Sequence, residues 1–180
     1  MKRIYIAGPS VFNRDIAFRD RLKKKVADAG FIPLYPADEQ EEAECNTPDA
    51  ITLALHIRAK NLALIEQADA IIASFEPFRG PSLDVGTAYE IGYAQAKAKP
   101  VFAYSTVGSD YKDRVIANNQ WSRPVSFQGK EAIVDDMGML IEDFGLKDNL
   151  MLAAKTDGSK LTVHTGLDEA IQEAKDYFAR

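Results

Sequence analysis

The chain has a single cysteine, Cys45, and only two histidines, His56 and His164, among its 180 residues. A lone cysteine excludes an internal disulfide and any zinc site made of cysteines, and it fits a reducing compartment. The two histidines lie far apart in the sequence, outside any spacing that is typical of metal ligands, so we expect no metal site. Cys45 lies among glutamates, which disfavour the reactive thiolate, so we expect it to be a poor nucleophile.

Long runs of one charge and long apolar runs are also missing. Lys and Arg number 22 against 27 Asp and Glu, which gives a net charge of −5 and no basic stretch for a phosphate backbone. We therefore expect small-molecule partners rather than nucleic acid. The apolar stretch Ile4–Ala7 is far too short for a signal peptide or a membrane span, so we expect a cytoplasmic protein with no membrane partner. Apolar residues make up 46% of the chain, enough for a sizeable core, and the length fits one domain over residues 1–180.

The motifs that bind common cofactors are absent. The chain contains neither the G-x-G-x-x-G pattern of dinucleotide-binding proteins nor the G-x-x-x-x-G-K-[ST] loop that holds ATP phosphates. No G-x-S-x-G motif presents a serine nucleophile, which argues against a Ser-His-Asp triad. We therefore expect a protein that works without a cofactor.

Strand and helix patterns alternate along the chain. Short β-branched and aromatic runs are followed by segments with apolar residues at helical spacing, and this order is typical of a parallel sheet with crossover helices. We expect an α/β fold with a doubly wound parallel sheet, Rossmann-like or flavodoxin-like, and helices on both faces. The expected strands are Arg3–Ala7, Phe31–Leu34, Ala70–Phe75 and Pro100–Tyr104, and the expected helices are 13–29, Ile51–Ala68, Val85–Lys97, Lys130–Phe144 and Gly166–Ala179, the last capped by Thr165 and Asp168.

Two segments lack such a pattern. Residues 37–48 are acidic and polar and predict a long loop, and residues 105–128 predict an excursion from the sheet. In sheets of this type, ligands bind beyond the carboxyl ends of the strands. We therefore expect the functional residues in Gly8–Asn13, in Glu76–Asp84 and in the segment after Tyr104. The turn residues that open the first of these loops fit a tight turn as well as they fit substrate contact.

The helix expected after the third strand has two acidic residues in different surroundings. Asp84 lies at the start of this helix, where a carboxylate caps free amides, and capping alone explains it. Glu90 stands among small and apolar residues, where a carboxylate is partly desolvated. Gly86 lies one turn before Glu90 on the same face and leaves space over it, although glycine costs about 1 kcal/mol in a helix relative to alanine. The plainer alternative is an exposed glutamate, with Gly86 and Gly92 serving helix packing.

Enzymes that cleave glycosidic bonds typically use a pair of carboxylates at one site. One carboxylate attacks the anomeric carbon or stabilises an oxocarbenium ion, while the other manages protons or sugar hydroxyls. Tyr5, at the end of the first strand, could reach Glu90 with its hydroxyl, or it could be an ordinary strand aromatic. Asp84 and Glu90 are therefore the candidate catalytic pair.

Short segments of the chain match, in order, the pattern of a known family. Residues 4–101 contain IYIAGP, ADAIIA, RGP, DVGTAYEIGYA and KPV, at 4–9, 68–73, 79–81, 84–94 and 99–101. The match resumes at Glu142–Leu146 and at Asp148–Met151. Each segment alone is weakly informative, but together and in this order they resemble the nucleoside 2-deoxyribosyltransferases.

This resemblance implies a transfer of 2-deoxyribose from one nucleobase to another through a covalent deoxyribosyl-enzyme ester. By position, Glu90 resembles the nucleophile, Asp84 the partner acid and Tyr5 the tyrosine that orients the nucleophile. The implied ligands are deoxynucleosides and nucleobases, and the implied assembly is a homo-oligomer in which a neighbouring subunit completes each site. The implied substrate-contacting residues are Gly8, Pro9, Phe12, Asn61, Arg79, Gly86, Asn149 and Met151, the last two from the neighbouring subunit.

One position departs from the family pattern. Many members have an aspartate that protonates the nucleobase where this chain has Asn61. An amide can hydrogen-bond a base but cannot act as its acid, so Asp84, Asp69 or water would have to protonate the leaving base. The sequence leaves the choice between purine and pyrimidine open. Residues 108–141, longer than in compact members, would form a wall of the site.

Two other functions remain compatible with these residues. Water in place of the second base would make the protein a nucleoside or nucleoside 5′-monophosphate hydrolase, with Arg79, Gly80 and Ser82 as candidate phosphate donors. The second alternative is a nucleotide-binding domain without catalysis, because such sheets host many binding functions. Glu90 beneath Gly86 argues against it, since a binding module has little need for that carboxylate.

Overall fold

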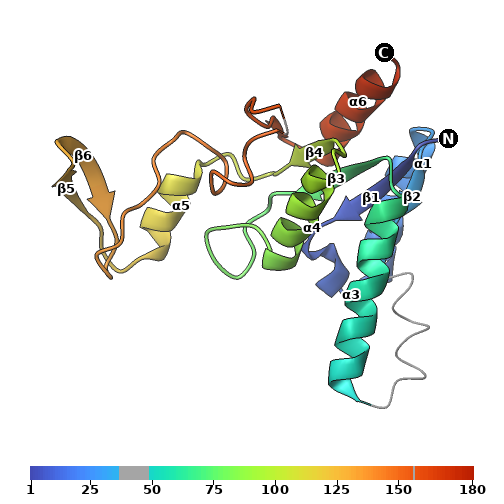
Figure 1. The fold of residues 1–180 in the computed structure, drawn as a ribbon, viewed down its shortest axis with the longest axis horizontal. Helices are drawn as coiled ribbons and strands as arrows, with labels where there is room; N and C mark the ends of the chain where they lie inside the picture. The colour runs from blue at the N-terminus through green and yellow to red at the C-terminus, as the bar shows by residue number, and fades with distance from the viewer. Residues whose placement is uncertain (37–48, 156) are drawn as a thin grey trace.

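The computed structural model describes residues 1–36, 49–155 and 157–180. The loop expected over residues 37–48, with Cys45, lies outside the described residues. Figure 1 shows a sheet flanked by helices and an extension that leaves it. The elements are β1 (Arg3–Ala7), a 3-10 turn (Pro9–Phe12), α1 (Ile16–Asp28), β2 (Ile32–Leu34), α3 (Ala50–Gln67), β3 (Ala70–Ser74), α4 (Val85–Ala96), β4 (Val101–Tyr104), α5 (Tyr111–Asn118), β5 (Arg123–Phe127), β6 (Lys130–Val134), β7 (Val163–His164) and α6 (Leu167–Phe178).

The main sheet is parallel throughout and has the order β2-β1-β3-β4-β7. The predicted doubly wound α/β fold is therefore confirmed. The chain adds strands on one side of β1 and then on the other, so β1 and β3 are neighbours in the sheet. Tyr5 of β1 stands opposite Ile71 of β3 in this register. The crevice outside the carboxyl ends of these two strands is the usual ligand position in such a sheet.

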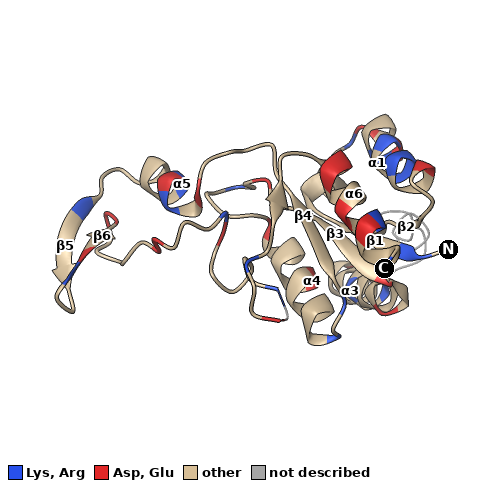
Figure 2. Ribbon diagram, turned by 90° about the horizontal axis from the view of Figure 1, so that it is seen from above, with Lys and Arg blue, Asp and Glu red and all other residues tan. Residues whose placement is uncertain are grey.

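Alternating side chains of β1 supply two separate cores. Ile4 and Ile6 pack with α1 and α6 on one face, and Tyr5 and Ala7 pack with α3 and α4 on the other. This alternation follows from the two-residue period of a strand. Charged residues are frequent along α1 and α6, whereas α4 has almost none (Figure 2). Glu90 is the only charged residue of α4.

Residues 106–150, here called the arm, leave the sheet after β4 and project away from it (Figure 1). They contain α5 and the antiparallel pair β5–β6, which forms a sheet of its own. The helix predicted over Lys130–Phe144 is wrong, because β6 occupies its first part. Gln128 and Gly129 have φ angles of 52° and 76°, the geometry of a two-residue hairpin turn. In the sequence, Gln128 and Gly129 were the turn signal that the prediction of a helix overlooked.

Two predicted helix starts also need correction. Asn13 Oδ1 accepts the amide of Asp15, so α1 begins at Ile16 rather than at Asn13. Gly166 is the N-cap of α6, one residue later than predicted, and Thr165 Oγ1 donates to Glu169 at 3.3 Å instead of capping the helix. Within the described residues, no helix is long and apolar enough to span a membrane.

Candidate active site

A pocket of about 430 Å³ lies between α3 and α4, near the carboxyl ends of the central strands. Its position follows from chain order, because a helix that follows a parallel strand begins at the edge where that strand ends. Each helix packs an apolar face against the sheet. The few polar side chains of these helices lie at the border of that face, beside the pocket. The lining residues are Ala54, Ile57, Arg58, Asn61 and Leu62 of α3 with Gly86, Tyr89 and Glu90 of α4.

Tyr5 and Glu90 meet beneath this pocket. The Tyr5 hydroxyl donates to Glu90 Oε1 at 2.6 Å, and the Tyr5 side chain is fully buried. Burial raises the pKa of Glu90 to about 7; the Tyr5 hydrogen bond opposes that rise, and the negative charge of Asp84 adds to it. Burial and the Glu90 charge raise the pKa of Tyr5, so its hydroxyl keeps its proton. Glu90 is therefore a carboxylate with a fixed orientation that changes charge near neutral pH.

Asp84 caps α4, as predicted from its position. Its Oδ2 accepts hydrogen bonds from the amide of Thr87 at 2.9 Å and from the Thr87 hydroxyl at 3.1 Å. A methyl group at Gly86 would lie 3.0 Å from the same oxygen, closer than most such contacts. Gly86 also lines the pocket with Glu90. The glycine therefore leaves room for the Asp84 carboxylate as well as for a ligand beside Glu90.

Asn61 belongs to the same pocket. Its Oδ1 is buried and has no hydrogen-bond partner within the described residues. An unpaired buried acceptor is unfavourable by about 1–3 kcal/mol, and in a pocket it is typical of an atom that a ligand or water satisfies. Asp69 lies just before β3, at the amino ends of the strands and therefore away from this pocket. There it accepts a hydrogen bond from the Arg3 amide at 2.8 Å. That hydrogen bond holds the pKa of Asp69 below its usual range, so Asp69 is not the acid for a base in this pocket.

Arg58 and Tyr89 are lining residues that the sequence analysis missed. Arg58 Nη2 donates to the Tyr89 hydroxyl at 2.9 Å, and the guanidinium lies 5.5 Å from the centre of the Tyr89 ring. The available signal was spacing, since Arg58 precedes Asn61 by three residues on one helix and shares its face. Arg58 therefore places a positive charge at the border of the pocket, and the Glu90 carboxylate lines the same pocket.

The loop after β1 lines a different pocket. Pro9 and Phe12 border a cavity of about 610 Å³ on the α1 and α6 face of the sheet. The Phe12 ring stacks on Phe78 with centroids 5.3 Å apart, and the Arg79 guanidinium lies over both rings. Gly8 packs against β3, where an added methyl group would lie 2.9 Å from the Ser74 Cβ. Of the predicted contacts, these four are therefore not among the residues that line the Glu90 pocket.

Asn149 and Met151 also lie outside the Glu90 pocket of their own chain. Asn149 Nδ2 donates to Glu142 Oε1 at 2.6 Å, within the root of the arm. Met151 is 75% exposed, which is unusual for a side chain of this type. The described residues contain no group of His, Cys, Asp and Glu side chains that could hold a metal ion.

Comparisons with known proteins identify the family and the fold. The family model described as nucleoside 2-deoxyribosyltransferase matches residues 4–151. The chain is 30% identical to a 2-desoxiribosyltransferase from Leishmania mexicana, with a TM-score of 0.71 over 98% of this chain and 99% of that one. It is 32% identical to an uncharacterized protein of Schizosaccharomyces pombe, over 98% of this chain and 89% of that one. A conserved protein from Enterococcus faecalis, 22% identical with a TM-score of 0.54 over 98% and 99% of the chains, shares the fold.

Proposed function

Because the chain belongs to the nucleoside 2-deoxyribosyltransferase family, we propose that it transfers a 2-deoxyribosyl group between nucleobases through an ester with Glu90. The observation that carries this proposal is the 2.6 Å hydrogen bond between Tyr5 and Glu90 at an open pocket. A half-buried carboxylate that costs free energy to ionise, held by a buried tyrosine, has no evident structural purpose. A nucleophile needs both features, since it must be oriented and must be poorly solvated.

The proposed reaction has two displacements. Ionised Glu90 attacks C1′ of the donor on the face opposite its base, and the C1′–N bond breaks with its electron pair leaving on the base, which takes up a proton. A nitrogen of the second base then attacks C1′ from the other face and loses its proton, and the C1′–O bond to Glu90 breaks. Two inversions restore the β configuration. Tyr5 keeps one carboxylate oxygen in place, so the other is available for attack.

Asp84 and Gly86 have supporting roles in this proposal. Asp84 uses Oδ2 for the Thr87 contacts, and we assign its Oδ1 to a sugar hydroxyl. The space beside Gly86 would receive the sugar ring. Protonation of the leaving base falls to Asp84 or to water, because Asn61 has no acidic proton and Asp69 lies at the other edge of the sheet. We assign the base to the α3 side of the pocket, where the Asn61 amide can hydrogen-bond it.

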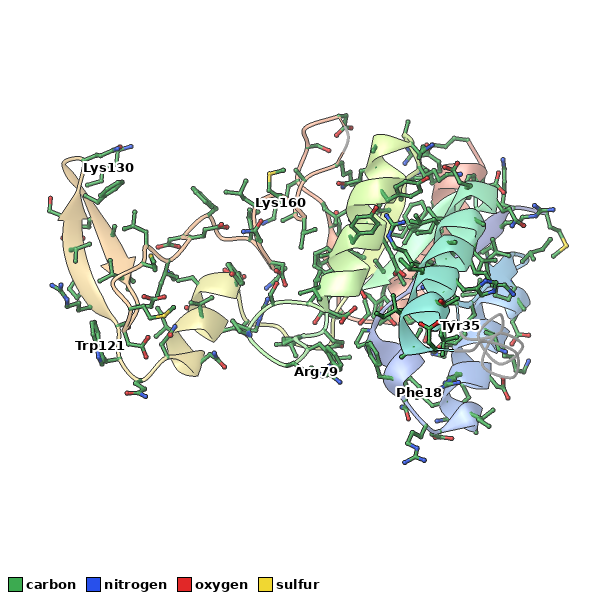
Figure 3. All side chains as sticks on the ribbon, turned by 60° about the horizontal axis from the view of Figure 1, so that its bottom comes forward. Phe18, Tyr35, Arg79, Trp121, Lys130 and Lys160 are labelled. Atoms are coloured by element: carbon green, nitrogen blue, oxygen red, sulfur yellow. The ribbon has the colours of Figure 1, made fainter. Side chains whose placement is uncertain are left out.

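A homo-oligomer with shared sites is part of the proposal. The arm supports it, because an isolated two-stranded hairpin is at best marginally stable and gains stability by packing against another surface. Figure 3 places Trp121 and Lys130 at the far end of the arm, well away from the body that carries Tyr35. We propose that the arm packs on a second copy of the chain and that Asn149 and Met151 reach that copy's site. The exposed apolar side chains of the arm include Trp121, Phe127, Met137, Met139, Leu140 and Phe144.

The monophosphate hydrolase has less support than the transferase. The Ser82 hydroxyl is already a donor to Asp148, and the Arg79 guanidinium is stacked over Phe12 and Phe78. One of its three candidate phosphate donors is therefore already used, and a second is held over two aromatic rings. A binding domain without catalysis would not explain the raised pKa of Glu90.

One assay tests the proposed function and separates the alternatives. The protein is incubated with a 2′-deoxynucleoside, with and without a different free base, and the products are separated by chromatography. A new deoxynucleoside that forms only with the second base supports transfer. Release of base at an equal rate without an acceptor would favour hydrolysis. Mass spectrometry of the Glu90 peptide should detect a deoxyribosyl adduct in the wild type and none in Glu90→Gln, and no product in any arm would refute catalysis.

A further inference from the structure

The loop that carries Asp84 is fastened to the root of the arm by one buried carboxylate. Asp148 is fully buried, and it accepts hydrogen bonds from the Ser82 hydroxyl and, at 2.9 Å, from the amide of Leu83. Leu83 immediately precedes Asp84, the N-cap of α4. Asp148 therefore holds the backbone next to the proposed catalytic carboxylate, although it lies 64 residues later in the sequence. It does not line the Glu90 pocket.

Arg114 of α5 completes the attachment from the other side. Its Nε donates to the Pro81 carbonyl at 2.7 Å, and its Nη1 donates to the Ser109 carbonyl at 2.7 Å. Its Nη2 donates to the Lys147 carbonyl and lies 3.4 Å from Asp148 Oδ2. One planar guanidinium thus connects three segments in a fixed geometry, which a lysine could not do. Figure 3 places Arg79, near the start of the loop, between the body and the arm.

Burial makes this pair unlike the other ion pairs of the described residues. The Arg114 and Asp148 side chains are 10% and 0% exposed, whereas the partners in the other pairs are much more open to solvent. A buried ion pair is weak evidence for stability, because desolvation offsets most of the attraction. It does fix geometry, because every donor and acceptor must keep its partner. The pair is therefore better explained by a requirement for position than by a requirement for stability.

We propose that Asp148 and Arg114 are positioning residues that hold Asp84 at its working distance from Glu90. This inference rests on the proposed roles of Asp84 and Glu90. The path is short: Asp148 fixes the amide of Leu83, Leu83 is joined to Asp84, and Asp84 binds Thr87 at the first turn of α4. The arm and α4 are then held in a fixed arrangement, because the loop at 79–84 joins them.

Hydrogen exchange tests the attachment without any assay of activity. The variants are Asp148→Asn, which keeps the shape but puts an NH₂ group against donors, and Ser82→Ala, which removes one donor. The control is Asp135→Asn, because Asp135 is also buried and accepts two backbone amides, from Met137 and Met139, entirely within the arm. We expect amide exchange at Leu83 and Thr87 to rise about tenfold in Asp148→Asn. Ser82→Ala should show a smaller rise at the same two amides, and Asp135→Asn should show none.

The pH dependence of activity gives a second readout, and a residue that served only folding would leave this pH dependence unchanged. A displaced Asp84 would lower turnover about 10–100-fold, because small errors of position are costly in catalysis. It would also remove one cause of the raised pKa of Glu90, so the acid limb of the kcat/KM profile should move to lower pH in Asp148→Asn. The limb should keep its wild-type position in Asp135→Asn.

The outcomes separate the two proposals. Unchanged exchange at Leu83 and Thr87 in both Asp148→Asn and Ser82→Ala, or an equal change in Asp135→Asn, would overturn the positioning role. If Asp148→Asn does not fold, the two amides in Ser82→Ala decide by themselves. A wild type without transferase activity would refute the proposed function, while the exchange data would still decide whether Asp148 positions Asp84.

Discussion

Replacing Glu90 by glutamine should abolish transfer and make the protein more stable above neutral pH. Glutamine has nearly the same shape, and its Oε1 can still accept the Tyr5 hydrogen bond. It cannot form the sugar ester, so turnover should fall by at least about 10³-fold. The gain in stability has a separate cause. Burial raises the pKa of Glu90 from 4.5 to about 7, which means that the folded state resists its ionisation.

The sign and size of this effect follow from proton linkage. Between pH 4.5 and 7 the folded wild type holds more protons than the unfolded chain, so its free energy of unfolding falls as the pH rises. This loss of free energy of unfolding is absent below pH 4.5 and complete above pH 7, where it amounts to about 3 kcal/mol. Glu90→Gln removes it. In a chain of this size the variant should melt about 5–10 °C higher at pH 8.5 and near the wild-type temperature at pH 4.5.

The assay is thermal unfolding of both proteins at several pH values from 4.5 to 8.5. Glu66→Gln is the control, because Glu66 is exposed and its pKa is held below the usual range by the hydrogen bond from Lys97. Its effect should be small and opposite in sign. A stability difference for Glu90→Gln that stays constant with pH, or that favours the wild type at pH 8.5, would show that Glu90 is not desolvated in solution.

Three further predictions concern the same site. Tyr5→Phe removes a hydrogen bond to a charged group worth about 1.5–3 kcal/mol, so the pKa of Glu90 should rise further and kcat/KM at pH 7 should fall about tenfold, with recovery near pH 9. A wild-type pH profile in this variant would make Tyr5 an ordinary strand aromatic. Gly86→Ala should lower turnover, because its methyl group would press on Asp84 Oδ2 at 3.0 Å; unchanged steady-state kinetics would mean that Gly86 serves packing alone. Glu90→Ala and Asn149→Ala subunits, each inactive, should regain part of the activity in verified mixed oligomers, and no recovery would place Asn149 outside a shared site.

Local sequence patterns were sufficient for the body of the fold. The apolar run at Ala70–Phe75 predicted a buried parallel strand, and the structure has β3 over Ala70–Ser74 with every residue buried. Asp84 was recognised as a cap, because capping depends on residues only three positions apart. Glu90 was found because a lone charge on an apolar helix is visible in sequence. These features depend on neighbours within one or two turns, which is why the sequence sufficed.

Contacts between distant segments were decided only by the tertiary structure. The helix predicted over Lys130–Phe144 became a strand, because a hairpin turn at Gln128 and Gly129 pairs it with β5. Phe12 was predicted to contact substrate, and the structure places it beside the cavity of about 610 Å³ rather than among the residues that line the Glu90 pocket. Asp148 could not be assigned in advance, because its partners Ser82 and Leu83 are more than sixty residues away. The sequence by itself determined four of the five strands of the sheet, the helices that cover it and the carboxylate at Glu90. Tertiary packing decided the edge strand β7, the environment that raises the pKa of this carboxylate and the contacts that hold its neighbour in place.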